Sequence, residues 1–102
     1  MSLSKQFLKS KPVCKVTFSV PAESINGAKN VSVVGEFNSW DAEATPLKKQ
    51  KDGSFKGTVE LATGKEFEFR YLVDGAIWLD ETEADKYAPS GVSFDKNSVV
   101  VL

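Results

Sequence analysis

The sequence predicts an all-β fold, a sandwich of about seven short antiparallel strands in a single domain. Two observations carry this prediction. Apolar and polar residues alternate with a period of two over most of the 102-residue chain, and no stretch keeps the 3.6-residue period of an amphipathic helix for three turns. Turn signals rich in Gly, Asn and Asp recur at short intervals between the alternating runs, which is typical of a β-sandwich.

The first predicted strands are separated by residues that interrupt a ladder or favour a turn. Residues 14–20 alternate and stop at Pro21, because proline cannot donate a hydrogen bond within a central ladder. A turn signal at Asn26-Gly27 precedes a second apolar strand over residues 31–37. The first half of the chain is therefore expected to consist of strands joined by turns.

The second half predicts further strands joined by tight turns. Asp52-Gly53 is a strong hairpin signal, because both turn positions must accept a positive φ angle. Residues 55–61 and residues 66–73 then alternate, each with an apolar face and a polar face. Asp74-Gly75 turns the chain back, and a closing strand is expected at residues 99–102.

The composition excludes several classes of function. The chain has no histidine and one cysteine, so it can assemble no Ser-His-Asp or Cys-His machinery and no zinc finger. Thirteen basic residues against fourteen acidic ones argue against a nucleic-acid surface, which needs a basic excess. No apolar run approaches the length of a membrane span. We therefore expect a neutral partner, with neither nucleic acid nor membrane bound, and no cofactor or metal.

The N-terminal segment is the one part expected to be separable. Residues 1–11 are predicted to form a flexible arm, because termini fray unless they are tied down, and residues 12–102 form the domain. The segment before Val13 lacks the apolar core of a signal peptide, about 7 to 15 residues long, so a cytoplasmic location is expected.

The two tryptophans are the most informative aromatic residues. Trp40 lies in a polar turn, residues 35–41, where no core residue is needed, and Trp78 follows the Asp74-Gly75 turn. An indole offers a broad apolar face and one N–H donor, which suits the C–H face of a pyranose ring without any charge on the ligand. The alternative interpretation is that both rings plug the ends of the sandwich, because tryptophan is highly buried on average.

The register after Asp74-Gly75 decides between these interpretations for Trp78. A two-residue loop places Trp78 on the core face. A three-residue loop pairs Trp78 with Leu72 instead, so that Trp78 shares the outer face with Arg70. We favour the three-residue loop, because it also sends the bulky Ile77 inward.

Two polar residues complete the candidate binding set. Arg70 carries a planar fork of donors that can reach vicinal hydroxyls; the alternative is a surface arginine paired with Glu68 or a cross-strand acid at little net gain. Asn97 has an amide that both donates and accepts; the alternative is a turn residue. The acidic residues 80–85 are interpreted as a solvated face, because nothing places two carboxylates across a cleft as glycoside hydrolysis requires.

Several segments together resemble carbohydrate-binding module family 48. They are V-S-V-V-G-E-F-N-S-W at residues 31–40, T-P-L at 45–47, D-G-S-F at 52–55, F-R-Y-L-V-D-G at 69–75 and N-S-V-V at 97–100. That family includes the glycogen-binding domain of the AMP-activated protein kinase β subunit and the N-terminal domains of isoamylases and branching enzymes. The resemblance implies an immunoglobulin-like β-sandwich that binds α-1,4-linked glucan and has no catalysis of its own.

The resemblance also implies a role for each candidate residue. Trp40 and Trp78 look like the tryptophans that stack on glucose rings. Arg70 stands where the kinase-subunit domain has a ligand-contacting lysine, and Asn97 looks like the asparagine that bonds glucose hydroxyls. Two residues separate V-D-G from Trp78 here, against one in the kinase-subunit members. The family's leucine-bearing loop has no clear counterpart, and Phe94 is the candidate to replace it.

The sequence thus predicts a non-catalytic module that binds glycogen, starch or related maltooligosaccharides, with a glucan-metabolising enzyme as a further partner. The alternative is a protein-interaction module of the same fold, whose glycan face is degenerate and which docks a glucan-metabolising enzyme or kinase. A buried Trp78 would favour that alternative.

Overall fold

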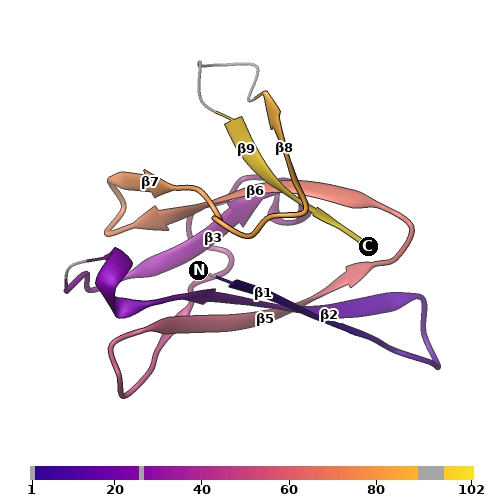
Figure 1. Ribbon diagram of the computed structural model, residues 1–102, viewed down its shortest axis with the longest axis horizontal. Helices are drawn as coiled ribbons and strands as arrows, with labels where there is room; N and C mark the ends of the chain where they lie inside the picture. Colours follow the sequence, from indigo (N-terminus) through magenta and orange to yellow (C-terminus); the bar gives the residue numbers. More distant parts are fainter. Residues whose placement is uncertain (1, 26, 90–95) are drawn as a thin grey trace.

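The computed structural model describes residues 2–25, 27–89 and 96–102, so the expectations for Asn26 and Phe94 lie outside the described residues. Nine strands are defined within this part of the chain, and they form two antiparallel sheets that face one another (Figure 1). The all-β sandwich predicted from the alternation is confirmed, with nine strands in place of about seven.

The first sheet has four strands in the order β1-β2-β5-β4. Their bounds are β1 (Ser2–Phe7), β2 (Val13–Val20), β4 (Lys48–Lys49) and β5 (Phe55–Ala62). The β4–β5 hairpin forms around Asp52-Gly53 as predicted, but through a longer loop in which Gly53 has φ of 87°. The lysines of β4 lie on the exposed edge of the sheet, where charge discourages pairing with another strand.

The second sheet has the order β3-β6-β9-β8, and β7 pairs with β6 beside β9. Its strands are β3 (Val31–Gly35), β6 (Glu66–Val73), β7 (Ile77–Leu79), β8 (Lys86–Pro89) and β9 (Lys96–Val101). β3 occupies one side of β6. On the other side, β7 pairs with residues 71–73 and β9 pairs with residues 66–69. Two short 3-10 helices, η1 (Ala22–Ser24) and η2 (Glu36–Asn38), flank β3.

The core lies between the sheets and takes alternate residues from each. Phe18 of β2 is fully buried and packs edge-on against Phe69 of β6, with ring centroids 5.1 Å apart, and against Tyr71 at 6.3 Å. Cys14 is also fully buried, as expected of a small hydrophobic residue. Because side chains of a strand alternate between faces, the same strands expose their polar residues on the outside.

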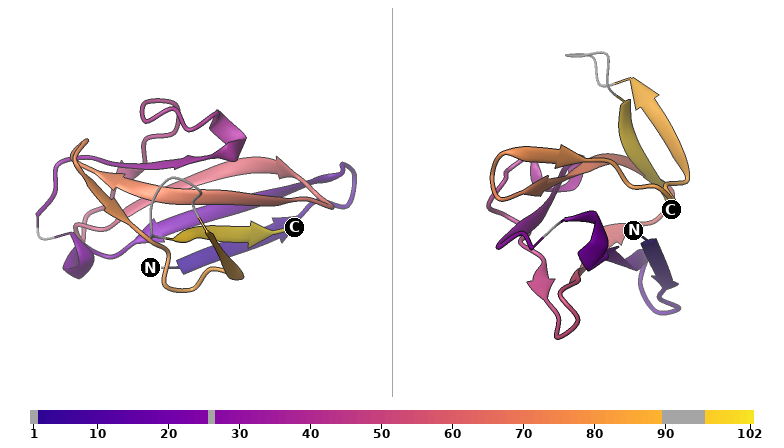
Figure 2. Two further views of the ribbon diagram at one scale, coloured as in Figure 1. Left: turned by 90° about the horizontal axis from the view of Figure 1, so that it is seen from above. Right: turned by 60° about the vertical axis from the view of Figure 1, so that its left-hand side comes forward.

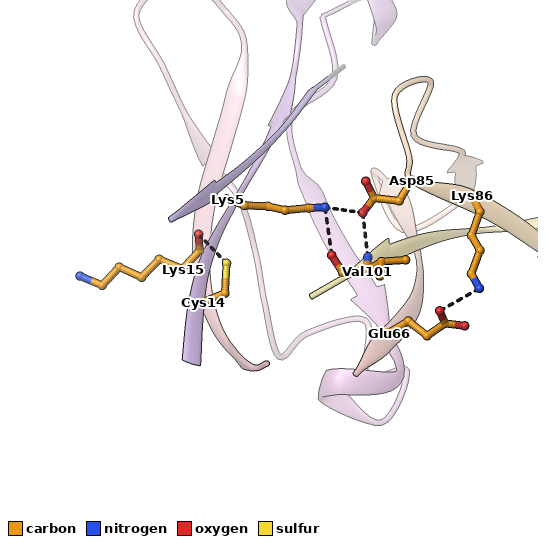
Figure 3. Close-up of polar contacts among 7 residues, drawn as sticks. All are labelled: Lys5, Cys14, Lys15, Glu66, Asp85, Lys86 and Val101. Carbon is orange, nitrogen blue, oxygen red and sulfur yellow. Dashed lines mark hydrogen bonds and ion pairs between the residues drawn. The ribbon is translucent and has the colours of Figure 1, made fainter. Parts of the chain in front are cut away.

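The N-terminal segment is tied to the sandwich through β1. This strand pairs with β2 along its whole length, which differs from the flexible arm expected over residues 1–11. Lys5 lies opposite Val16, a core residue, so its side chain points to the inner face of the sheet. Its Nζ lies 2.6 Å from Asp85 Oδ2 and 3.0 Å from the carbonyl oxygen of Val101 (Figure 3). The lysine therefore links the first strand to the opposite sheet.

Asp85 completes this link. Its Oδ2 also accepts a hydrogen bond of 2.7 Å from the backbone N–H of Val101. Partial burial raises the pKa of Asp85, but the hydrogen bonds from Lys5 and Val101, together with the charge of Lys5, lower it by more. The pKa of Asp85 consequently lies below its ordinary value of 3.8.

Asp85→Asn is expected to lower the free energy of unfolding by about 1 kcal/mol or less at pH 7, because this ion pair is partly exposed. The folded pKa of Asp85 is depressed, so its contribution is present above the ordinary value of 3.8 and is lost as pH falls through the folded pKa. Urea unfolding of wild type and variant should therefore give curves that converge as pH falls from 7 toward about 2.5.

The matched control is Glu66→Gln, which breaks the Lys86–Glu66 ion pair of 2.8 Å between two half-exposed side chains (Figure 3). We expect almost no change in stability for that variant. A difference between wild type and Asp85→Asn that stays constant down to the lowest pH would contradict the role given to the Lys5–Asp85 pair.

Candidate functional site

The turn after β3 begins with a glycine that no other residue can replace without a shift. Gly35 is paired with Phe69, and a Cβ atom at Gly35 would lie 2.5 Å from the carbonyl oxygen of Glu68 and 2.7 Å from Phe69 Cβ. Both contacts are shorter than real Cβ contacts. The glycine of the G-E-F-N-S-W segment therefore allows β3 to approach β6 closely at the point where the turn starts.

The next three residues of the segment hold the turn in place. Glu36 Oε1 accepts a 2.7 Å hydrogen bond from the N–H of Glu68. Phe37 packs on Phe18, with ring centroids 5.8 Å apart. Asn38 Oδ1 accepts from the N–H of Gly35, and its Nδ2 donates to the carbonyl of Val33 and to Thr45 Oγ1, each bond measuring 3.0 Å. The asparagine thus ties both ends of the turn together.

Trp40 lies at the end of this turn in an unusual backbone conformation. Ser39 and Trp40 have φ angles of 57° and 58°, a left-handed region that costs a bulky residue energy. The N–H of Trp40 donates to the carbonyl of Gly35 over 2.8 Å, which compensates part of that cost. The side chain is nevertheless 41% exposed. The turn therefore presents an indole at the surface. The backbone of the segment that follows β3 lies beside the β3 edge of the sheet (Figure 2).

The hairpin between β6 and β7 has the three-residue register that the sequence favoured. Val73 pairs with Ile77, and Leu72 pairs with Trp78. Asp74 connects this turn to the segment before β3, because its Oδ1 accepts hydrogen bonds of 2.9 and 2.8 Å from the backbone N–H groups of Lys29 and Asn30. Trp78 is therefore on the outer face of the sheet and is 46% exposed.

The reason given for that register was wrong in one respect. Ile77 was expected to turn inward beside Val73, but it is 58% exposed. It points to the core side of the sheet at the hairpin tip, where no part of the opposite sheet covers it within the described residues. The loop length, rather than burial of Ile77, is what sends Trp78 outward.

Arg70 and Trp78 are in direct contact. The guanidinium carbon of Arg70 lies 5.8 Å from the centroid of the Trp78 ring, in a cation–π geometry. Arg70 Nε also donates to Asp80 Oδ1 over 3.0 Å. The cross-strand acid that the sequence offered as an alternative partner of Arg70 is therefore present. Asp80 bonds only Nε of Arg70, so the other N–H groups of the guanidinium lie beside the exposed indole of Trp78.

Asn97 lies on β9, and the β6–β9 register places it next to Arg70 on the outer face. Its amide does not bond Arg70. Asn97 Nδ2 donates to Glu68 Oε1 over 3.1 Å, and the residue is 6% exposed. The structure thus brings Arg70 and Trp78 into contact, brings Asn97 to the adjacent strand, and leaves Trp40 on a separate turn at the other edge of β6.

The outer face between these residues has an apolar floor. Val34, Leu72 and Val99 are buried on this face, outside the main core cluster. Toward the hairpin end, a depression of about 470 Å³ opens between the sheet and the segment that follows Trp40. Its lining includes Ser32, Leu72, Gly75, Glu43 and Pro46. Exposed aromatic rings, an apolar floor and flanking hydrogen-bonding groups suit a ligand with both apolar and hydroxyl surfaces.

A buried glutamate supports the segment that follows Trp78. Glu81 is fully buried, and its carboxylate accepts hydrogen bonds from Tyr71 Oη at 2.7 Å and from the N–H of Glu83 at 2.9 Å. Its N–H donates to Ser98 Oγ over 2.8 Å, and Tyr87 donates to its carbonyl. Burial, with the charge and hydrogen bond of Glu81, raises the pKa of Tyr71 far above its ordinary range.

This network corrects the interpretation of residues 80–85 as a solvated acidic face. Glu81 is an internal anchor, and Asp80 is the partner of Arg70. The predicted register already contained the signal for Asp80, because a pairing of Leu72 with Trp78 continues to Arg70 with Asp80. No comparable signal marks Glu81, whose burial depends on Tyr71 from another strand. Among the described residues, no group of three acidic or cysteine side chains is arranged to hold a metal ion.

An antiparallel sandwich that presents exposed indoles and an arginine on one sheet has the make-up of a β-sandwich binding module. The chain belongs to the family described as the glycogen recognition site of AMP-activated protein kinase, whose sequence profile matches residues 23–100, more than half of the chain. The suspected membership in this group of carbohydrate-binding modules is thereby confirmed. No curated protein matched the chain. The described part of the chain contains no helix long and apolar enough to cross a membrane.

Gly35→Ala is expected to lower the free energy of unfolding by about 1–3 kcal/mol, because the added methyl group meets backbone and Cβ atoms that cannot move independently. Gly57→Ala in β5 is the matched control. There the nearest atom is the terminal Cδ2 of Leu47 at 2.6 Å, which a rotamer change can move away. Urea unfolding of both variants checks this, and an equal or larger loss for Gly57→Ala would contradict it.

Proposed function

We propose that this chain is a non-catalytic module that binds glycogen, starch or related α-1,4-glucan on the outer face of β3, β6 and β7. The observation that carries the proposal is the exposed indole of Trp78 with the guanidinium of Arg70 beside it, in a chain that belongs to a glycogen recognition family. An α-1,4-glucan is uncharged, and a nearly neutral chain with a net charge of −1 suits an uncharged ligand.

Each proposed contact follows from the chemistry of the side chain. Trp40 and Trp78 stack on the C–H faces of glucose rings, which are apolar. Arg70 donates to vicinal hydroxyls through the guanidinium N–H groups that Asp80 does not use. Asn97 contributes its amide oxygen and the amide N–H that does not bond Glu68. A single site of this open kind has an affinity in the micromolar to millimolar range, on the order of −4 to −8 kcal/mol.

Polymeric ligands are bound more tightly than short ones under this proposal. Glycogen offers many chain ends, and several modules on one particle raise the apparent affinity without any new contact.

A glucan-metabolising enzyme brought to the polymer is the second partner that we propose. The cytoplasmic location expected from the sequence stays a prediction, which cell fractionation tests.

Two observations weigh against the other functions considered. Trp78 is exposed, whereas a buried Trp78 would have favoured the protein-interaction alternative. The two carboxylates that follow Trp78 have structural partners, since Asp80 pairs with Arg70 and the buried Glu81 accepts a hydrogen bond from Tyr71. This arrangement supports a binding role rather than the paired free carboxylates of a glycosidase.

Trp40→Ala and Trp78→Ala are each expected to weaken maltoheptaose binding by about tenfold or more, because each removes one stacking face, and tenfold corresponds to about 1.4 kcal/mol. The chain has two tryptophans, so each variant keeps one indole as a fluorescence reporter for the titration. Phe7→Ala, which removes a 56%-exposed aromatic ring from β1 in the other sheet, is the control and should bind as the wild type does.

Two outcomes would count against the proposal. If the wild type gives no saturable signal at millimolar sugar, the module does not bind this glucan. If Trp40→Ala binds maltoheptaose with the wild-type affinity while Trp78→Ala binds it more weakly, Trp40 is not part of the surface. The stacking platform then consists of Trp78 alone.

A further inference from the structure

The guanidinium beside Trp78 is largely neutralised by its neighbour. Arg70 Nε lies 3.0 Å from Asp80 Oδ1, and the two side chains are 16% and 45% exposed respectively. At this separation the opposite charges cancel most of each other's field at any greater distance. The more accessible member of the pair is the carboxylate. A ligand that approaches Trp78 therefore meets an anion first.

Neighbouring strands add two more carboxylates to the same region. Glu68 lies two residues before Arg70 on the same face of β6, about 7 Å away along the strand. Glu36 lies where β3 ends, and its Oε1 accepts from the N–H of Glu68 over 2.7 Å. One guanidinium thus stands among three carboxylates, those of Asp80, Glu68 and Glu36. The candidate surface carries an excess of negative charge although the whole chain is almost neutral.

We propose that this arrangement, with Asp80 as the decisive residue, makes the surface select unphosphorylated glucan over glucan that carries phosphate monoesters. The proposal rests on the glucan-binding function proposed above. A neutral ring can donate its hydroxyls to Asp80 and accept from the N–H groups of Arg70 that Asp80 does not use. A phosphate monoester, with a charge of about −1.5 to −2, is instead repelled by the surplus carboxylates and finds the guanidinium of Arg70 already paired with Asp80.

The expected size of this preference follows from Coulomb's law. Across about 7 Å of a largely aqueous medium, the surplus negative charges weaken binding of a phosphorylated chain by about tenfold at low ionic strength. Salt screens this repulsion, since the Debye length is about 30 Å at 0.01 M and about 3 Å at 1 M. The preference should therefore nearly disappear at high salt, whereas stacking on tryptophan is little affected.

The test compares two ligands that differ only in phosphate. A phosphorylated maltodextrin and the same preparation after phosphatase treatment are titrated into the full chain at about 0.01 M and about 1 M NaCl, with tryptophan fluorescence as the readout. We expect the dephosphorylated dextrin to bind about tenfold more tightly at low salt, with a ratio close to one at high salt.

Two variants with the same charge change separate Asp80 from the general charge of the protein. Asp80→Asn removes the carboxylate charge but keeps an oxygen that can accept from Arg70. Because this halves the surplus of negative charge, the low-salt preference should fall from about tenfold to about threefold. Glu66→Gln also releases a cation, Lys86, from an ion pair. It lies on the same face of β6 but four residues from Arg70, about 13 Å along the strand. At this greater distance its charge should lower the low-salt preference by only about twofold or less.

The outcomes distinguish this proposal from the function on which it rests. Equal or tighter binding of the phosphorylated dextrin by the wild type would overturn the selectivity while leaving glucan binding intact. An equal fall in preference for Asp80→Asn and Glu66→Gln would remove Asp80 from its decisive role. Failure of the wild type to bind either dextrin at millimolar sugar would overturn both proposals together.

Discussion

The close approach of β3 and β6 at Gly35 is the constraint on which the candidate surface depends. It lets Val34 lie opposite Arg70 and lets the turn after β3 begin against the backbone of Glu68. From that point Asn38 folds the turn back on itself, and the carbonyl of Gly35 receives the N–H of Trp40. A wider separation of the two strands would loosen the turn and move Trp40 relative to Arg70.

The strands of the sandwich and the outer position of Trp78 could be predicted from the sequence, because both depend on local rules. Alternation sets which side chains of residues 66–73 face the core, and the length of the loop sets whether Trp78 is on that face or on the other one. The pairing of β1 with β2 was not predicted, because the alternation of β1 is weak. The ion pair between Lys5 and Asp85, which also ties β1 to the domain, joins residues 80 positions apart. Long-range contacts of this kind leave little trace in a local pattern.

The two acidic neighbours of Trp78 illustrate the same limit within the candidate site. Continuing the predicted register by two residues places Asp80 opposite Arg70. Their ion pair could therefore be predicted from the local sequence. Glu81 is not, because its burial follows from Tyr71, a phenol that points into the core and needs an acceptor there. The carboxylate that meets this need also fixes the chain directly after Trp78. A side chain that looks like part of a solvated face in the sequence thus supports the candidate surface from the interior of the domain.

The G-E-F-N-S-W segment shows why a family motif and a binding site are separate matters. Gly35 allows the strands to approach, Phe37 fills the core and Asn38 closes the turn, so most of the segment serves the fold. Trp40 is different, because the turn holds it at positive φ and leaves its ring exposed, and neither feature stabilises the sandwich. Within this segment the indole of Trp40, rather than the motif around it, is therefore the part on which the proposed glucan binding depends.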